Sequence, residues 1–330
     1  MAGYTTVAHT GAVTFWEFIM SIGRGRRLAS LLVATVAALP WVGKSADDRG
    51  ADGIPAFANI AHRGASGSAP EATLPAFEKA VTARADYLEM DIQMSRDGHL
   101  VAIHDTYLDR TTDGSGRVGD HTLAELKALD AGSWFNRAYP DRADPAYAGL
   151  QLLTLDEIIE AFGTDRRYYI ETKSPELYPG VEAKLIETLE AHGLIERNNV
   201  VLQSFSADSL KKLHALNSDV PLVQLLWYGR TADGELVEES GLTPPLSSAG
   251  VADFRAIARY ANGIGPNVED GGQRVVDASF VTRAHRAGLL VHVYTVDDTG
   301  TMNELIDAGV DGIFTNFPAR LDRILDRRAD

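Results

Sequence analysis

The segment from Tyr87 to Asp105 holds two carboxylates and a histidine whose spacing could support chemistry. Glu89 and Asp91 alternate with apolar residues, as in a strand with one polar face, and the Asp97-Gly98 pair that follows is a tight-turn signal. A connection this short joins antiparallel strands, so the predicted hairpin brings His104 roughly opposite Asp91. Two carboxylates on one strand face with an imidazole across from them could bind a metal ion and transfer a proton. The alternative is an ordinary solvated hairpin at the edge of a sheet.

Strand and helix patterns along the chain predict how these residues are positioned. A buried strand at residues 57–61 runs into His62, and Pro70-Glu71 then begins a helix, since proline is favoured in the first turn. Eight strand centres can be identified, and they are Ile60, Leu88, Ile170, Leu202, Val223, Ile264, Val293 and Ile313. Eight strand–helix units predict an α/β fold, a closed (β/α)8 TIM barrel, with residues from about 93 to 149 as a small insertion after the second strand. An open doubly wound sheet is the alternative, but no Gly-x-Gly-x-x-Gly follows the first strand.

The barrel prediction places a set of polar residues at one mouth, where barrel enzymes carry their chemistry. Each member ends or follows a predicted strand, and the set is His62, Arg63, Glu89, Asp91, Glu171, Lys173, Gln203, Asn267 and Tyr294. Single members have simpler explanations, such as a surface ion pair for Glu171 and Lys173. The coincidence of all of them at strand ends favours a functional site.

Composition and charge narrow the possible partners. The 330 residues carry a formal charge of −15 and include no cysteine, so neither disulfides nor thiolate zinc sites are available. Nucleic acid is excluded as a partner because phosphate backbones are bound by net basic surfaces. An anionic small substrate would require a local positive pocket or a bound cation.

The first 45 residues have the order of a secretory signal. Three arginines at 24–27 precede an apolar run at 28–39, and small residues suited to a cleavage site follow at Gly43 and Ser45, with Met20 as a candidate start. The run is too short for a comfortable membrane span, so we expect no stable span in the mature protein. We expect a leader at 1–45, a linker at 46–56, a catalytic barrel at 57–330, and an exported protein that is periplasmic or secreted. An uncleaved amphipathic anchor and twin-arginine export are the alternatives.

Several short motifs follow one another in order between Asn59 and Pro318. They are His62-Arg63-Gly64, Pro70-Glu71-x-Thr73, Glu89-x-Asp91, Asp97-Gly98, His104-Asp105, Arg110-Thr111-Thr112, Glu171-Thr172-Lys173, Leu202-Gln203-Ser204-Phe205, Gly263-Ile264-Gly265-Pro266 and Tyr294-Thr295. In this order they resemble the glycerophosphodiester phosphodiesterase family, and the last three look like its periplasmic branch. Two positions depart from the family pattern: Ala72 stands where asparagine is usual, and Tyr294 where many members have tryptophan.

The resemblance implies a metal-dependent barrel enzyme that hydrolyses glycerophosphodiesters, such as glycerophosphocholine and glycerophosphoethanolamine, to sn-glycerol 3-phosphate and an alcohol. Glu89, Asp91 and Glu171 would hold one divalent cation, and such hard oxygen donors suit Ca²⁺ or, as the alternative, Mg²⁺. His62 and His104 would be the acid–base pair, with both assignments of acid and base open at this point. Six further residues would assist them: Arg63 and Lys173 would bind the substrate phosphate, and Glu71, Gln203, Asn267 and Tyr294 would support the site or line the substrate pocket.

Two rival functions are less consistent with the residues. A phospholipase D-like lyase would form a cyclic phosphate from lysophospholipid or sphingomyelin, but such enzymes usually carry disulfides. A non-catalytic binding protein would not require both histidines and all three carboxylates. The predicted mouth offers no aromatic box, and the loop 231–250 contains no aromatic residue. We therefore expect broad tolerance of the alcohol.

Overall fold

The structure is a computed structural model that describes residues 53–329. The predicted leader and residues 46–52 of the predicted linker lie outside the described residues. Within 53–329, no helix has both the length and the apolar character that crossing a membrane requires.

Eight parallel strands form a closed barrel, which confirms the predicted fold. β1 pairs with β2 on one side and with β13 on the other, so the sheet has no open edge between its first and last strands. Each predicted strand centre lies in one of the eight strands. In their order around the barrel, the strands are β1 (Ala58–Ala61), β2 (Tyr87–Met94), β4 (Tyr168–Thr172), β5 (Val200–Ser204), β6 (Leu222–Leu226), β9 (Gly263–Pro266), β12 (Leu290–Val293) and β13 (Gly312–Thr315).

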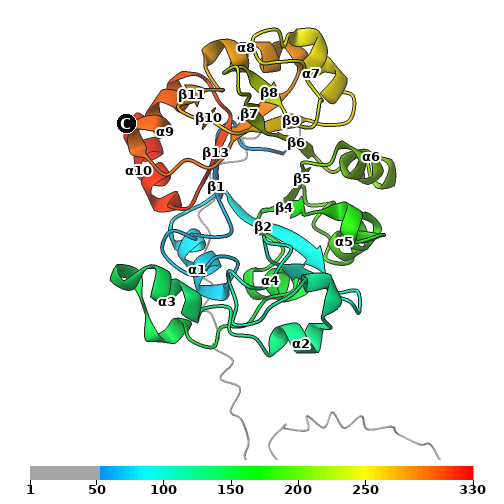
Figure 1. Ribbon diagram of the computed structural model, residues 1–330, viewed down its shortest axis with the longest axis vertical. Coiled ribbons are helices and arrows are strands. Elements are labelled where there is room, and N and C mark those ends of the chain that lie inside the picture. Colours follow the sequence, from blue (N-terminus) through cyan, green and yellow to red (C-terminus); the bar gives the residue numbers. More distant parts are fainter. Residues whose placement is uncertain (1–52, 330) are drawn as a thin grey trace, which may run out of the picture. The chain divides into compact units, whose positions relative to one another are not determined.

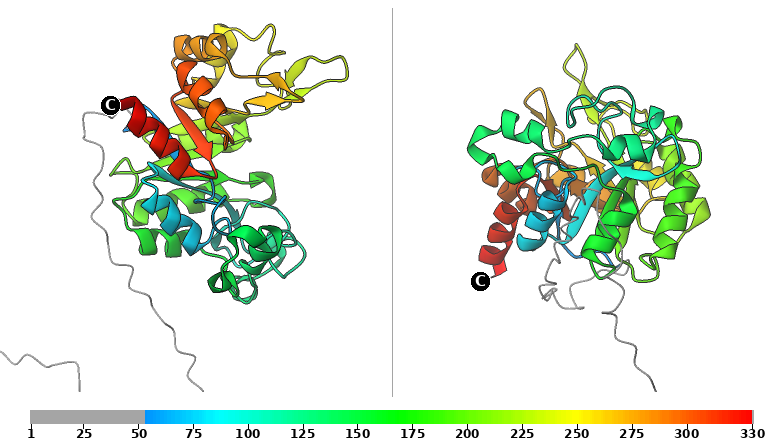
Figure 2. Two further views of the ribbon diagram at one scale, coloured as in Figure 1. Left: turned by 90° about the vertical axis from the view of Figure 1, so that its left-hand side faces the viewer. Right: turned by 90° about the horizontal axis from the view of Figure 1, so that it is seen from below.

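Helices surround the strands, as Figures 1 and 2 show. They are α1 (Leu74–Thr82), α4 (Leu155–Phe162), α5 (Val181–Ala191), α6 (Ala207–Leu216), α7 (Val251–Ile257), α8 (Ala278–Ala287), α9 (Thr299–Asp307) and α10 (Pro318–Ala329). α1 begins later than predicted, at Leu74, with Thr73 as its N-cap and Pro75 in its first turn. The cause is Ala72, whose φ of 55° is left-handed and interrupts a helix that would begin at Pro70-Glu71.

The interior of the barrel explains how the strands present polar side chains at the mouth. Ala58, Ile60, Tyr87, Tyr169, Val201, Val223 and Phe314 form a buried cluster there, together with Ile54. Side chains alternate along a strand, so residues two positions beyond this layer face the same interior space. His62, Glu89 and Glu171 follow Ile60, Tyr87 and Tyr169 in this way.

The insertion between β2 and α4 begins with the predicted hairpin. β3 (Leu100–Ala102) pairs antiparallel with β2, and Ile92 lies opposite Ala102. Ile103 therefore lies opposite Asp91, and His104 lies one residue further along than the approximate prediction. The segment from Trp134 to Gly149 contains part of a helix. The remaining elements of the insertion are η2 (Val118–Asp120), α2 (Leu123–Lys127), α3 (Ser133–Ala138), η3 (Pro140–Arg142) and η4 (Pro145–Tyr147).

Further short elements follow the carboxyl ends of β4, β6 and β9. The predicted long loop at 231–250 contains one arm of a hairpin made by β7 (Tyr228–Arg230) and β8 (Leu236–Glu238). β10 (Glu269–Asp270) pairs with β11 (Gln273–Arg274), and η5 (Pro175–Leu177) follows β4.

Candidate active site

One cavity of about 240 Å³ lies at the carboxyl ends of the barrel strands. Nine of the predicted site residues line it, and they are His62, Arg63, Glu89, Asp91, His104, Glu171, Lys173, Gln203 and Tyr294. Because they come from five barrel strands and the insertion, the closed barrel itself brings them together. Glu71 and Asn267 do not line this cavity.

Glu89, Asp91 and Glu171 form a buried group that could hold a metal ion. One carboxylate oxygen of each lies within 4.8 Å of the others, and strand pairing places Asp91 directly beside Glu171. The Gln203 amide donates to Glu89 Oε1 at 3.2 Å, whereas Gln203 Oε1 is buried and has no hydrogen-bond partner among residues 53–329. A set of carboxylate oxygens with one further unsatisfied oxygen beside it fits a hard divalent cation.

The charges around this group are unevenly balanced. Burial raises the pKa of Glu171 to about 8 and also raises the pKa of Glu89, where the neighbouring Asp91 adds to the effect. Burial alone would raise the pKa of Asp91 as well, but the Lys173 ammonium and the Arg63 guanidinium hold it below its usual range. The corresponding distances are 3.4 Å from Lys173 Nζ to Asp91 and 3.2 Å from Arg63 Nε to Asp91. The group therefore has room for additional positive charge, which a divalent cation would supply.

His62 contacts a neutral partner. Its Nδ1 lies 2.8 Å from Asn316 Oδ1, and the Asn316 amide nitrogen donates to Asp297 at 2.8 Å. Because the Asn316 nitrogen is used in this way, its oxygen faces His62 and accepts a hydrogen from Nδ1, which leaves the lone pair on Nε2. Burial, together with the nearby Arg63 charge, lowers the pKa of His62 to about 4. His62 is therefore neutral near pH 7.

His104 contacts a carboxylate instead. Its Nδ1 lies 2.6 Å from Asp105 Oδ1, and its side chain is 29% exposed. Burial lowers the pKa of His104 and the charges of Arg63 and Lys173 add to that shift, while the charge of Asp91 and the hydrogen bond to Asp105 oppose it. An imidazole held by a carboxylate has its charged form stabilised, as in the pairing of histidine and aspartate in serine hydrolases.

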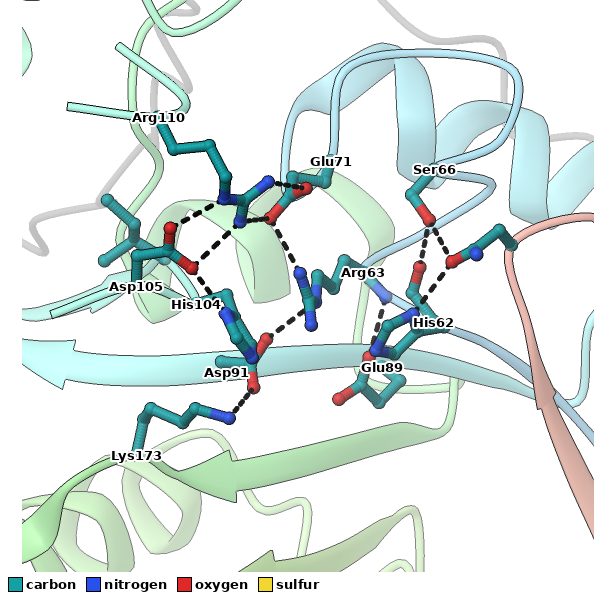
Figure 3. Close-up of polar contacts among 12 residues, drawn as sticks. His62, Arg63, Ser66, Glu71, Glu89, Asp91, His104, Asp105, Arg110 and Lys173 are labelled. Carbon is teal, nitrogen blue, oxygen red and sulfur yellow. Dashed lines mark hydrogen bonds and ion pairs between the residues drawn. The ribbon is translucent and has the colours of Figure 1, made fainter. Parts of the chain in front are cut away.

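Glu71 supports the site from outside the cavity. It accepts from Arg63 at 3.0 Å and from Arg110 at 2.7 and 2.8 Å. Arg110 also contacts both oxygens of Asp105, the partner of His104. Figure 3 traces these contacts from Glu71 to the two arginines and on to His104 and Asp91. Arg63 is thus linked to the histidine on the insertion through Glu71, Arg110 and Asp105.

Asn267 and Tyr294 have different positions. Asn267 is buried, and its side chain binds the backbone N–H and carbonyl of Tyr228, so it holds the start of the β7–β8 hairpin. The Tyr294 hydroxyl donates to the Leu226 carbonyl at 2.7 Å, which leaves the ring along the cavity.

Sequence reasoning missed several residues at the mouth. No aromatic box was predicted at the mouth, but Phe205 and Trp227 line the cavity together with Tyr294. Strand alternation could have found both, because Phe205 continues the inward series of Val201 and Gln203 beyond the end of β5. Broad tolerance of the alcohol stays a prediction, although the argument from absent aromatic rings no longer supports it. Asn316 and Asp297, which orient His62, carry no local signal of their own.

Comparison with known proteins agrees with this geometry. The profile of the Glycerophosphoryl diester phosphodiesterase family matches residues 62–320. A glycerophosphodiester phosphodiesterase of Bacillus subtilis is 43% identical over 305 residues, which cover 91% of this chain and 94% of the relative. A probable glycerophosphodiester phosphodiesterase 1 of Mycobacterium tuberculosis is 32% identical over 79% of this chain and 89% of its own length.

A solved structure shares the fold. The phosphodiesterase of Oleispira antarctica, solved in complex with its product sn-glycerol 3-phosphate, is 27% identical with a TM-score of 0.67, over 83% of this chain and 97% of that chain. With the family profile spanning the barrel and its mouth, the chain belongs to the glycerophosphoryl diester phosphodiesterase family.

Proposed function

We propose that this enzyme hydrolyses glycerophosphodiesters to sn-glycerol 3-phosphate and an alcohol, with one divalent cation as cofactor. The observation that carries the proposal is the buried Glu89–Asp91–Glu171 group, which shares one cavity with His62 and His104. A phosphodiester is a stable anion, so its cleavage requires neutralised charge, an activated nucleophile and a protonated leaving oxygen. The names of the relatives and the product bound in the Oleispira structure support this substrate class.

The three carboxylates would hold the cation, with Gln203 Oε1 close by. When bound, a divalent ion stabilises negative charge that develops on phosphoryl oxygens. Oxygen donors of this kind favour Ca²⁺, with Mg²⁺ as the alternative. Arg63 and Lys173 lie beside the same carboxylates and would bind the remaining phosphoryl oxygens.

The histidines divide the proton transfers. Neutral His62, with its lone pair on Nε2, would accept a proton from the attacking hydroxyl. His104, whose charged form Asp105 stabilises, would donate a proton to the leaving alcohol oxygen. This assignment follows from the different Nδ1 partners of the two rings.

We also propose that the protein is exported, to the periplasm or the exterior of the cell. The support is the basic, apolar and small-residue order of residues 24–45. Cell fractionation tests this, with amino-terminal sequencing to locate the cleavage, and activity confined to the cytoplasmic fraction would contradict it.

The function is tested with purified protein and glycerophosphocholine. We expect release of sn-glycerol 3-phosphate and choline, loss of activity after EDTA treatment, and recovery with Ca²⁺ or Mg²⁺. ³¹P NMR separates the hydrolase from the lyase, because a lyase accumulates a cyclic phosphate. Bis(4-nitrophenyl) phosphate, which lacks glycerol, should be a much poorer substrate. Full activity after EDTA treatment or equal turnover of the glycerol-free diester would reject the proposal.

A further inference from the structure

Gln93 has no role in the chemistry described above, yet its side chain makes an unusually complete set of contacts. It lies on β2, two residues beyond Asp91, and is fully buried. Its Nε2 lies 3.0 Å from the carbonyl oxygen of Ile103, 3.0 Å from that of His104 and 2.7 Å from that of Asp105. Its Oε1 accepts a hydrogen bond of 2.7 Å from the Tyr178 hydroxyl.

These contacts fix the orientation of the carboxamide. Three carbonyl oxygens surround its nitrogen, and a reversed amide would place its oxygen against all three. Burial raises the pKa of Tyr178 to about 12, so the hydroxyl keeps the proton that it donates. Both the nitrogen and the oxygen of the Gln93 carboxamide are therefore hydrogen-bonded, and the two N–H hydrogens are shared among three carbonyl oxygens.

The segment that Gln93 holds is the one that carries His104. Strand pairing between β2 and β3 ends at Ala102, and the last backbone contact of this ladder is the Ile103 N–H to the Asp91 carbonyl at 3.0 Å. The backbone of His104 lies beyond it. Asp105 holds the ring at Nδ1, but the distance from the ring to the β2 carboxylates depends on where the backbone lies.

We infer that Gln93 and Tyr178 are positioning residues for His104, holding its backbone at a fixed place beside the metal-binding carboxylates of β2. The inference rests on the proposed catalytic role of His104. β2 would then supply two metal-binding residues and also position a histidine of another segment. Loss of the Gln93 contacts should lower kcat, because a displaced proton donor stabilises the transition state less well. The metal ligands should stay in place.

The molecule contains a matched comparison. Gln224 on β6 is also fully buried, and its Nε2 lies 3.2 Å from the Ser204 carbonyl, 3.0 Å from that of Phe205 and 2.9 Å from that of Leu225. The Tyr260 hydroxyl donates to its Oε1 at 2.9 Å. The hydrogen bonds are of the same kind, but the segment that Gln224 holds carries Phe205, which lines the cavity and cannot transfer a proton.

The experiment compares Gln93→Leu and Gln224→Leu, each in the parent enzyme and in a His104→Ala background. Every variant is assayed with glycerophosphocholine, whose alcohol requires protonation, and a high enzyme concentration makes the slow His104→Ala background measurable. Both leucine variants should lower the melting temperature, since each leaves buried carbonyls unsatisfied. Gln93→Leu should lower kcat of the parent by about 10- to 100-fold and leave metal affinity unchanged. This loss does not exceed the loss expected when the general acid or base itself is removed. In the His104→Ala background the same change should have little further effect, because the two act as a unit.

Gln224→Leu should act mainly on KM, and its effect should be the same in both backgrounds. Tyr178→Phe and Tyr260→Phe repeat the comparison with milder changes and replace the leucine variants if those do not fold. An equal loss from Gln93→Leu or Tyr178→Phe with and without His104 would overturn the inference. A parent enzyme inactive on glycerophosphodiesters would instead reject the proposed function, so the two failures are distinguishable.

Discussion

At the scale of single residues, the two histidines are distinguished by what contacts Nδ1. An amide oxygen accepts a hydrogen from His62 and adds no charge, whereas a carboxylate faces His104. Deep burial keeps His62 neutral, with a pKa of about 4. A neutral ring with a free Nε2 lone pair can accept a proton, and a ring whose charged form is stabilised can donate one.

This difference predicts opposite responses to the leaving group. His62→Ala and His104→Ala should each lower kcat/KM on glycerophosphocholine by ~10²–10⁴-fold, the usual effect of removing a general acid or base. Glycerophospho-4-nitrophenol releases a weakly basic alcohol that requires no protonation, so His104→Ala should recover most of its loss on that substrate. His62→Ala should remain slow on both. Steady-state kinetics with the two substrates check the assignment.

Two other histidines serve as controls for these variants. His121 is half-buried and His285 is exposed, and they contact a carbonyl and the Asp311 carboxylate, respectively, away from the cavity. His121→Ala and His285→Ala should keep the parental rate on both substrates. Recovery of His62→Ala instead of His104→Ala would reverse the assignment of base and acid.

At the scale of elements, the sequence predicts the strands well because they are short buried apolar runs that alternate with helices. It predicts helix starts less well. Pro70-Glu71 has the composition of a first turn, but the left-handed Ala72 stops the helix there, and a φ value cannot be inferred from alanine. Hairpin register was missed by one residue at His104, because the Ser95 N–H bonds to the His99 carbonyl and the turn therefore spans three residues, not the two that Asp97-Gly98 suggests.

The start of α3 in the insertion depends on a close approach between backbone segments. Gly132 is its N-cap with φ −120°, and a Cβ there would lie 1.8 Å from the Tyr147 carbonyl oxygen. Gly132→Ala should therefore force Tyr147 and η4 away from α3, and overpacking of this kind typically costs about 1–3 kcal/mol. Urea unfolding followed by tryptophan fluorescence measures the loss, with Trp134 on α3 as a local probe.

Gly250 provides the matched control. It is the N-cap of α7 with φ −119°, and a Cβ there would meet only Asp253 Oδ2, at 3.7 Å. Gly250→Ala should change the free energy of unfolding by less than about 0.5 kcal/mol, as expected of a change without a clash. Equal destabilisation by the two alanines would show that the N-cap position, and not the Tyr147 contact, is responsible.

At the scale of the whole molecule, closure of the barrel creates contacts that no local pattern contains. His62 follows the first strand and Asn316 the last, 254 positions apart, and the pairing of β1 with β13 brings them to 2.8 Å. Residues at strand ends could be predicted as a set because parallel strands share one mouth. Which of them touch depends on the register between neighbouring strands, and the strand pattern does not give that register.

Closure also traps a titratable group in the barrel interior. His292 on β12 is fully buried, its Nδ1 lies 3.0 Å from the Tyr169 hydroxyl, and its Nε2 has no hydrogen-bond partner among residues 53–329. Burial lowers its pKa from 6.5 to about 4, so the unfolded chain binds a proton at a higher pH than the folded barrel does. The contribution of His292 to the free energy of unfolding is therefore fully present above the unfolded pKa of about 6.5, and it is lost as the pH falls towards 4. Between pH 7.5 and pH 5 this loss is about 2 kcal/mol. Urea unfolding at both pH values should show that His292→Gln loses about 2 kcal/mol less than the parent over this interval, whatever its stability at pH 7.5. The control His121→Gln, at a half-buried position outside the barrel interior, should follow the parent. A parallel decline of the parent and His292→Gln would mean that the acid sensitivity of the barrel lies elsewhere.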